Sequence, residues 1–239
     1  MKKVLYVSGF ALLLFVLQSC GGPRLKGSGN VSTETRSVTG SYSKVALKGS
    51  MDVEFTQGPA QAAIIEADDN ILPYIELNVH DDELVVDLKD DVSIKSHHGI
   101  KIKITAPDVY QLSLSGSGNI VVTNTLENSE PVRFKLTGAG NVVAAVNSPR
   151  VIASSAGSGD IKLTGETKDL EVSMAGSGNF EGAELHTENT KVTIAGSGNA
   201  DVHASLKLNA KIVGSGDVSY KGSPEVTSSI AGSGSVHKD

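Results

Sequence analysis

Residues 174–180 read Met-Ala-Gly-Ser-Gly-Asn-Phe, and the Gly-Ser-Gly at their centre is the motif that decides the fold. The motif occurs six times from residue 116 onward, and residues 138–140 carry the variant Gly-Ala-Gly. Successive first glycines are 22, 19, 19, 20, 18 and 18 residues apart. A repeat of this length is typical of a solenoid, in which each coil buries its apolar face by stacking on its neighbours. The first glycines are Gly116, Gly138, Gly157, Gly176, Gly196, Gly214 and Gly232.

The residues around each motif show strand periodicity. Counted from the first glycine, positions −2 and +4 are apolar with few exceptions, and they are separated by an even number of residues. We therefore expect them to line one interior. Both glycines share this parity, which predicts a tight corner without room for a side chain. Position −2 holds Leu114, Leu136, Ser155, Met174, Ile194, Ile212 and Ile230, and position +4 holds Ile120, Val142, Ile161, Phe180, Ala200, Val218 and Val236.

Polar side chains occupy the opposite parity. Position +1 is serine in every coil except the one with Ala139. If the coils stack in register, position +3 forms an outward ladder whose amide side chains hydrogen-bond from coil to coil, as in stacked cross-β structures. The residues at +3 are Asn119, Asn141, Asp160, Asn179, Asn199, Asp217 and Ser235.

Residues 40–110 are also rich in expected strands but are less regular. Residues 84–88 and 100–104 place apolar side chains at alternate positions, and residues 49–52, Gly-Ser-Met-Asp, repeat the frame of the coils. Residues 68–74 predict a turn or a single helical turn. We expect one all-β domain over residues 40–237, with coils of 18–22 residues over 111–237.

The N-terminus predicts an exported lipoprotein. A basic start precedes a mostly apolar stretch, residues 4–17, that is too short to span a membrane. Residues 17–20, Leu-Gln-Ser-Cys, resemble a bacterial lipobox, so we expect residues 1–19 to be a signal peptide and Cys20 to be lipidated. The alternative is an ordinary secretory signal, but a lone cysteine is otherwise hard to place in an exported protein. Residues 20–39 would form a lipidated, flexible tether.

Lipidation of Cys20 predicts the membrane as a partner, since two or more acyl chains anchor a protein stably. Gly21 follows the cysteine where retention at the inner membrane would call for aspartate, so we expect the outer membrane of a Gram-negative bacterium. No acidic cluster follows either, which leaves periplasmic and surface-facing orientations open. Without Lys2 and Lys3 the chain keeps 19 basic and 27 acidic residues, a formal charge of −8 that disfavours nucleic acid as a partner.

The lipobox, the strand-rich first part and the glycine coils together resemble the putative auto-transporter adhesin, head GIN domain family. The resemblance covers roughly residues 42–220, with Ala106-Pro107 and residues 112–119 first, the coils next, and Tyr-Lys-Gly-Ser-Pro at 220–224 last. It implies a right-handed parallel β-helix, or β-solenoid, in an exported protein of Gram-negative bacteria. It supplies no catalytic residues.

The sequence offers only weak candidates for catalytic and metal-binding sites. Calcium β-rolls need more glycine motifs per coil and more regular aspartates than these coils have. A glycosidase would need a pair of carboxylates at a set separation. A metal site at His97 and His98 is disfavoured, because adjacent residues of a strand point to opposite faces. We expect the carboxylates and the two histidines to lie in polar turns or loops, and we predict no enzyme activity, cofactor or metal site. The carboxylates considered are Asp81, Asp82, Glu83, Asp90 and Asp91.

The expected function is therefore that of a lipid-anchored β-solenoid of the cell envelope, a putative adhesin that presents a rigid, repetitive face to a glycan or a protein. The alternative is a periplasmic structural or envelope-sensing lipoprotein that assembles with a protein partner. The last coil places Ile230 and Val236 at its apolar positions without an evident polar cap. This predicts pairing of that end with a partner or with a second copy, as a homo-oligomer.

Overall fold

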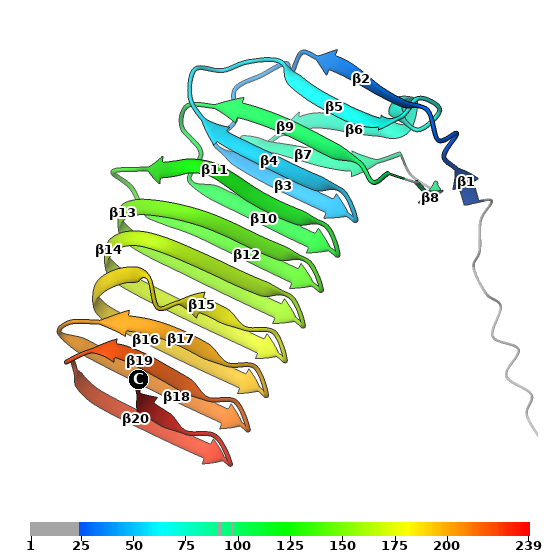
Figure 1. Ribbon diagram of the computed structural model, residues 1–239. Coiled ribbons are helices and arrows are strands. Elements are labelled where there is room, and N and C mark those ends of the chain that lie inside the picture. The colour runs from blue at the N-terminus through cyan, green and yellow to red at the C-terminus, as the bar shows by residue number, and fades with distance from the viewer. Residues whose placement is uncertain (1–23, 90–91, 97) are drawn as a thin grey trace, which may run out of the picture.

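The computed structural model describes residues 24–89, 92–96 and 98–239, which form a β-solenoid of about seven turns (Figure 1). The fold class is therefore the one predicted from the glycine repeat. One 3-10 helical turn, η1 (Leu72–Tyr74), lies within the stretch expected to turn. Within the described ranges, no helix has the length and apolar character needed to cross a membrane.

The strands are short at the N-terminal end and longest in the middle of the stack. In chain order they are β1 (Arg24–Lys26), β2 (Val31–Arg36), β3 (Lys44–Gly49), β4 (Asp52–Gln57), β5 (Ala63–Asp68), β6 (Ile75–His80), β7 (Glu83–Leu88), β8 (Ser93–Lys95), β9 (Lys101–Ala106), β10 (Gln111–Gly116), β11 (Asn119–Glu127), β12 (Val132–Gly138), β13 (Asn141–Gly157), β14 (Asp160–Gly176), β15 (Phe180–Gly182), β16 (Leu185–Gly196), β17 (Ala200–Ala204), β18 (Lys207–Gly214), β19 (Val218–Gly222), β20 (Glu225–Gly232) and β21 (Val236–Lys238).

Each coil supplies strands to two stacked sheets, and within the stack neighbouring coils pair in parallel. We call the sheet of strands that lead into the Gly-Ser-Gly corners the inbound sheet, and the sheet of strands that leave them the outbound sheet. β13 and β14 belong to both, because their pairing continues around the opposite corner. The inbound order is β7, β3, β10, β12, β13, β14, β16, β18, β20, and the outbound order is β9, β4, β11, β13, β14, β15, β17, β19, β21.

The glycine corners stack backbone on backbone. A Cβ added at Gly178 would lie 2.0 Å from the carbonyl oxygen of Gly159, and one added at Gly116 would lie 2.0 Å from that of Gly49. The first glycine of each motif also has a positive φ, for example +139° at Gly116, which only glycine adopts without strain. The predicted corner without room for a side chain is confirmed.

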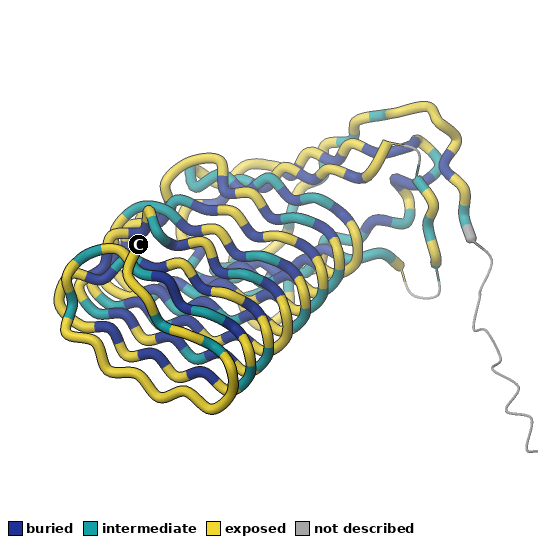
Figure 2. The backbone as a smooth tube through the Cα atoms, turned by 60° about the horizontal axis from the view of Figure 1, so that its bottom comes forward, coloured by how far each residue is buried: buried dark blue, intermediate teal, exposed yellow. Residues whose placement is uncertain are grey.

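The core lies between the two sheets and runs the length of the stack (Figure 2). Positions −2 and +4 are buried in the coils from β10 to β19, as their parity predicted. Phe55, Phe134 and Phe180 are the largest of the fully buried side chains. In the last described coil, Ile230 is 42% exposed, because none of the described residues stacks on the outer side of β20.

At the N-terminal end, the spatial order of the coils differs from their order in the chain. β3 and β4, joined by the corner at Gly49, lie between the coil of β7 and β9 and the coil of β10 and β11. Asp52 aligns with Asn119, so residues 49–52 belong to the repeat frame, as expected. Antiparallel strands then extend both sheets: β6 pairs with β7, β5 with β9, and β2 with β5 (Figure 1).

Residues 24–36 differ from the expected flexible tether. β1 pairs in parallel with β8, and all six residues of β2 pair with β5. The physical reason is backbone hydrogen bonding: β5 would otherwise leave one side unpaired, and β2 satisfies it. The described part of the chain is therefore ordered from Arg24 onward, ahead of the domain start expected at residue 40.

Candidate functional site

The corner amides form the ladder that the repeat predicted. The Asn119 amide nitrogen donates to Asp52 Oδ1 at 2.7 Å, and that of Asn141 donates to Asn119 Oδ1 at 2.9 Å. Farther along, Asn199 donates to Asn179 Oδ1 at 3.4 Å. Because an amide carries two N–H donors, each ladder asparagine keeps a second donor for solvent or a ligand.

A groove of about 580 Å³ lies beside this ladder on the outer side of the outbound sheet. We call it the outbound groove. It forms where β15 is only three residues long and the chain turns at Ala183 and Glu184, so that the sheet surface is hollowed. Most of its lining residues are of polar types, and they come from five strands and the turns beside them. The lining residues are Lys162, Leu163, Thr164, Asn179, Glu181, Ala183, Glu184, Asn199, Asp201, Asp217, Ser219, His237 and Asp239.

The outbound groove is acidic. Lys162 pairs with Glu181 at 3.3 Å, and Lys221 reaches Glu184 from the groove's edge at 2.7 Å. The hydrogen bond from Lys221 holds the pKa of Glu184 below its ordinary value. Hydrogen bonds from the Ser235 hydroxyl and backbone N–H lower the pKa of Asp217 in the same way. Glu184 and Asp217 therefore stay ionised at neutral pH, and the groove can accept hydrogen bonds or hold positive charge.

A second groove, of about 410 Å³, lies at the corner opposite the glycines. The rings of His186 and His203 meet there edge to face, with centroids 4.9 Å apart. The backbone N–H of Thr187 donates to His203 Nδ1 at 3.3 Å, so this nitrogen is an unprotonated acceptor. Burial lowers the pKa of His203, and the nearby His186 lowers it further.

Sequence reasoning missed the hydroxyl groups that hold this opposite corner. Ser148 Oγ donates to the Arg150 carbonyl at 2.9 Å, and Thr187 Oγ1 donates to the His203 carbonyl at 2.6 Å. The signal was present in the sequence: a serine or threonine lies nine residues before the first glycine in six coils. These residues are Ser129, Ser148, Thr167, Thr187, Ser205 and Ser223.

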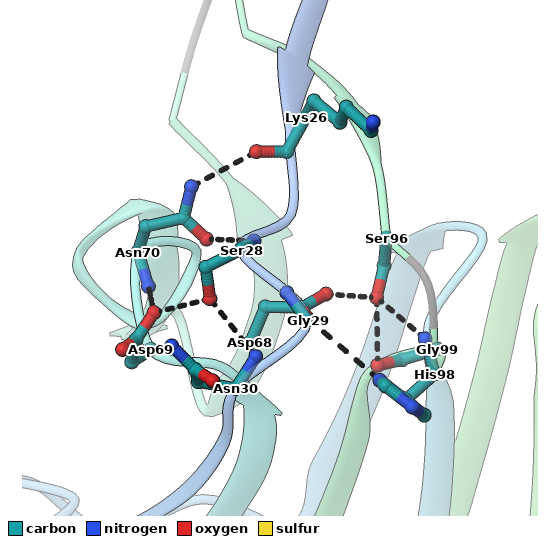
Figure 3. Close-up of polar contacts among 10 residues, drawn as sticks. All are labelled: Lys26, Ser28, Gly29, Asn30, Asp68, Asp69, Asn70, Ser96, His98 and Gly99. Atoms are coloured by element: carbon teal, nitrogen blue, oxygen red, sulfur yellow. Dashed lines mark hydrogen bonds and ion pairs between the residues drawn. The ribbon is translucent and has the colours of Figure 1, made fainter.

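The N-terminal segment is held by a cluster of polar contacts, which we call the N-terminal clasp (Figure 3). It joins residues 26–30 to residues 68–70, to Ser96 and to His98. Asp68 has no exposed surface, and its carboxylate accepts hydrogen bonds from the Gly29 N–H at 2.8 Å and from Ser96 Oγ at 2.6 Å. His98 Nδ1 lies 3.8 Å from Asp68 Oδ1.

Further contacts in the clasp come from its neighbouring residues (Figure 3). Ser28 donates from its hydroxyl to Asp69 at 2.5 Å and from its backbone N–H to the Asn70 side chain at 2.9 Å. Asn70 in turn donates to the Lys26 carbonyl at 2.9 Å. Its polar groups are thus paired with one another, which makes the clasp a structural element.

The carboxylates at residues 81–83 lie at the turn between β6 and β7. Asp81 and Asp82 have positive φ angles of 49° and 66°. Asp82 accepts hydrogen bonds from the backbone N–H and the hydroxyl of Ser43, and Lys44 lies 3.8 Å away. This exposed turn agrees with the expected polar turn. It ties the start of β3 to β7.

The remaining sequence candidates stay separate. Cys20, Asp90, Asp91 and His97 lie outside the described residues, and His98 belongs to the N-terminal clasp. Across residues 24–89, 92–96 and 98–239, no three of the His, Asp and Glu side chains are grouped so that they could hold a metal ion.

The family described as putative auto-transporter adhesin, head GIN domain, matches residues 41–224. A structure described as a putative adhesin from Bacteroides fragilis is 25% identical, with a TM-score of 0.84 over 90% of this chain and 100% of its own. One described as a putative lipid binding protein from Parabacteroides distasonis is 26% identical, with a TM-score of 0.75 over 91% and 100%. No curated protein matches the sequence.

Proposed function

Because this chain belongs to the putative auto-transporter adhesin, head GIN domain family, we propose that it binds a neutral, hydroxyl-rich glycan in the outbound groove while anchored to the membrane through Cys20. The family and its structural neighbours are described as adhesins or binding proteins and not as enzymes, and an adhesin-like family suggests a bacterial cell-envelope or surface protein. The family description names no ligand, and among the two neighbours only the one described as a putative lipid binding protein names a ligand class. The proposal of a glycan therefore rests on the chemistry of the groove.

The observation that carries this proposal is the row of hydrogen-bonding groups across the outbound groove. Glu181 and Asp201 align on neighbouring strands, and Asn179 and Asn199 line the same hollow. Carboxylates accept hydrogen bonds and amides both donate and accept, which suits the hydroxyls of a sugar. The acidic charge of the groove disfavours anionic glycans, because like charges would be brought together.

The outbound groove of a single molecule would bind a glycan only weakly. It is open, and its lining holds no phenylalanine, tyrosine or tryptophan to provide a large apolar contact. Strong attachment would therefore depend on many anchored copies engaging one surface, since linked weak sites gain affinity from effective concentration. Two or more acyl chains on Cys20 would hold each copy in place.

A direct test compares glycan binding by the wild-type chain with binding by Glu181→Ala/Asp201→Ala, using an array of neutral and anionic glycans. We expect the double variant to lose most of the signal for neutral glycans. Asn209→Ala is the matched control, because Asn209 is exposed on the inbound sheet and should leave binding unchanged. Equal binding by all three chains, or binding of anionic glycans alone, would overturn the proposal.

The alternative role, a periplasmic structural or sensing lipoprotein, is favoured by one observation: β20 and β21 have no neighbour on their outer side among the described residues. Protease treatment of intact cells separates the two roles, with Cys20→Ala as the control for anchoring. Digestion from whole cells supports a surface-facing adhesin. Protection until the outer membrane is opened supports the periplasmic role.

A further inference from the structure

The segment just before the domain carries a complete coil signature. Residues 27–30 are Gly-Ser-Gly-Asn, the same four residues found at three corners of the solenoid, 116–119, 176–179 and 196–199. Leu25 stands at position −2 and Val31 at position +4, so the apolar frame is also present. By sequence, residues 25–33 therefore match the corner segment of a coil.

The structure does not use this segment as a coil. β1 pairs with β8, which lies outside the main stack, and β2 runs antiparallel to β5. Val31, which holds a core position in the repeat frame, is 45% exposed. The N-terminal clasp holds the segment through its glycine corner, with Gly29 donating to Asp68. A sequence suited to stacking is thus held where one of its two apolar frame residues, Val31, remains exposed, whereas Leu25 is partly buried against the core.

The opposite end of the solenoid presents a matching surface. β20 pairs only with β18, and β21 only with β19, among the described strands. In β20, Val226 and Ile230 align with the buried Leu208 and Ile212 but are 39% and 42% exposed. An edge of this kind has unpaired backbone groups and accepts another strand readily.

The corner at this end restricts what can stack on it. In the preceding coils, each corner glycine lies so close to the corner beneath that a Cβ would approach a carbonyl oxygen to between 1.8 and 2.2 Å. A segment that stacks on Gly232 and Gly234 must therefore also carry glycine at both positions. Outside the coil corners, Gly-Ser-Gly occurs in this chain only at residues 27–29.

We propose that residues 25–33 of one molecule leave the N-terminal clasp and add to β20 and β21 of a second copy as one further corner segment, stacked in parallel. The register follows from the repeat: Leu25 stacks on Ile230, residues 27–29 on residues 232–234, and Val31 on Val236. The intramolecular clasp competes with this exchange. Because donor and acceptor surfaces differ, the contact is head-to-tail and extends into a chain of molecules.

The test uses a peptide of residues 24–36 with the full chain, read by hydrogen exchange of β20 and β21. We expect excess peptide to slow exchange of the outward-facing amides of β20 at least about tenfold, because they gain backbone partners. A peptide with Ser28→Ala should act in the same way. A peptide with Gly27→Val and Gly29→Val should have no effect, because its side chains would meet the corner backbone.

Two chain variants complete the test without disturbing the interior. Ile230→Lys in the full chain should abolish protection by the wild-type peptide, whereas Val213→Lys, exposed on the same sheet one coil earlier, should preserve it. Unchanged exchange of β13 in both variants confirms that they are folded. The proposal is overturned if millimolar wild-type peptide leaves β20 unprotected, or if the valine peptide protects it equally.

Discussion

Substitution of Gly178 by alanine tests the stacking of the glycine corners most directly. Gly178 is buried, and its φ is outside the positive range, so alanine introduces a steric change without backbone strain. The new Cβ would lie 2.0 Å from the Gly159 carbonyl oxygen. Since close carbon–oxygen contacts begin at about 3.3 Å, neighbouring coils must separate locally by roughly 1.3 Å.

The cost has two parts. Forcing an added group into a packed site costs about 1–3 kcal/mol. The separation also strains the hydrogen bond from the Gly178 N–H to the Gly157 carbonyl, at 3.2 Å, and that from the Asn179 N–H to the Asp160 carboxylate, at 2.7 Å. Losing these adds about 2–3 kcal/mol. We therefore expect Gly178→Ala to destabilise the fold by about 3–6 kcal/mol, or roughly 10 °C in Tm.

Urea unfolding followed by circular dichroism measures this difference, with the m value checked because a solenoid can unfold in segments. Ser177→Ala is the matched control. Ser177 is exposed, and Ala139 occupies the equivalent position in another coil, so we expect a change below about 0.5 kcal/mol. If Gly178→Ala unfolds at the wild-type urea concentration, close backbone stacking is not what requires glycine at this corner.

Three further predictions concern charged and titratable groups. Asp68→Ala should cost at least about 1.5 kcal/mol and speed proteolysis before residue 40, because the N-terminal clasp loses its buried acceptor; limited proteolysis measures this. Hydrogen bonds from Lys191 and Arg150 lower the pKa of Glu171, so the stability that these ion pairs give the fold is present above pH 4.5 and is lost as the pH falls through the lowered pKa. The wild type should therefore exceed Glu171→Gln in free energy of unfolding by under about 1 kcal/mol at pH 7, and this difference should disappear in acid. Burial lowers the pKa of His203, so the unfolded chain binds more protons than the folded chain, and the free energy of unfolding should fall as the pH drops below 6.5. The decrease should be less steep in His203→Asn, and melting curves from pH 7.5 to 5 test this.

The sequence was sufficient to predict the coil, its corner and its core. These features depend on local geometry that every coil repeats: alternation along a strand, and glycine where one backbone meets the next. The amide ladder was predictable for the same reason, since residues such as Asn119 and Asn141 are brought together by register alone. The hydroxyl groups at the opposite corner followed an equally regular spacing and could have been found in the same way.

Only the tertiary structure decided which coil lies beside which. The repeat frame of Asp52 fits next to that of any other coil as well as next to that of Asn119. Local sequence could therefore not show that β3 and β4 lie between the coil of β7 and β9 and the coil of β10 and β11. Nor could it show that residues 27–30, with the same motif as the corners, would bind Asp68 instead. The outbound groove likewise depends on the short β15 relative to its neighbours. The repeated residues of each coil determine how one coil stacks on the next. The order of the coils follows from the free energy of the whole fold, because capping strands and polar contacts stabilise one arrangement over the others.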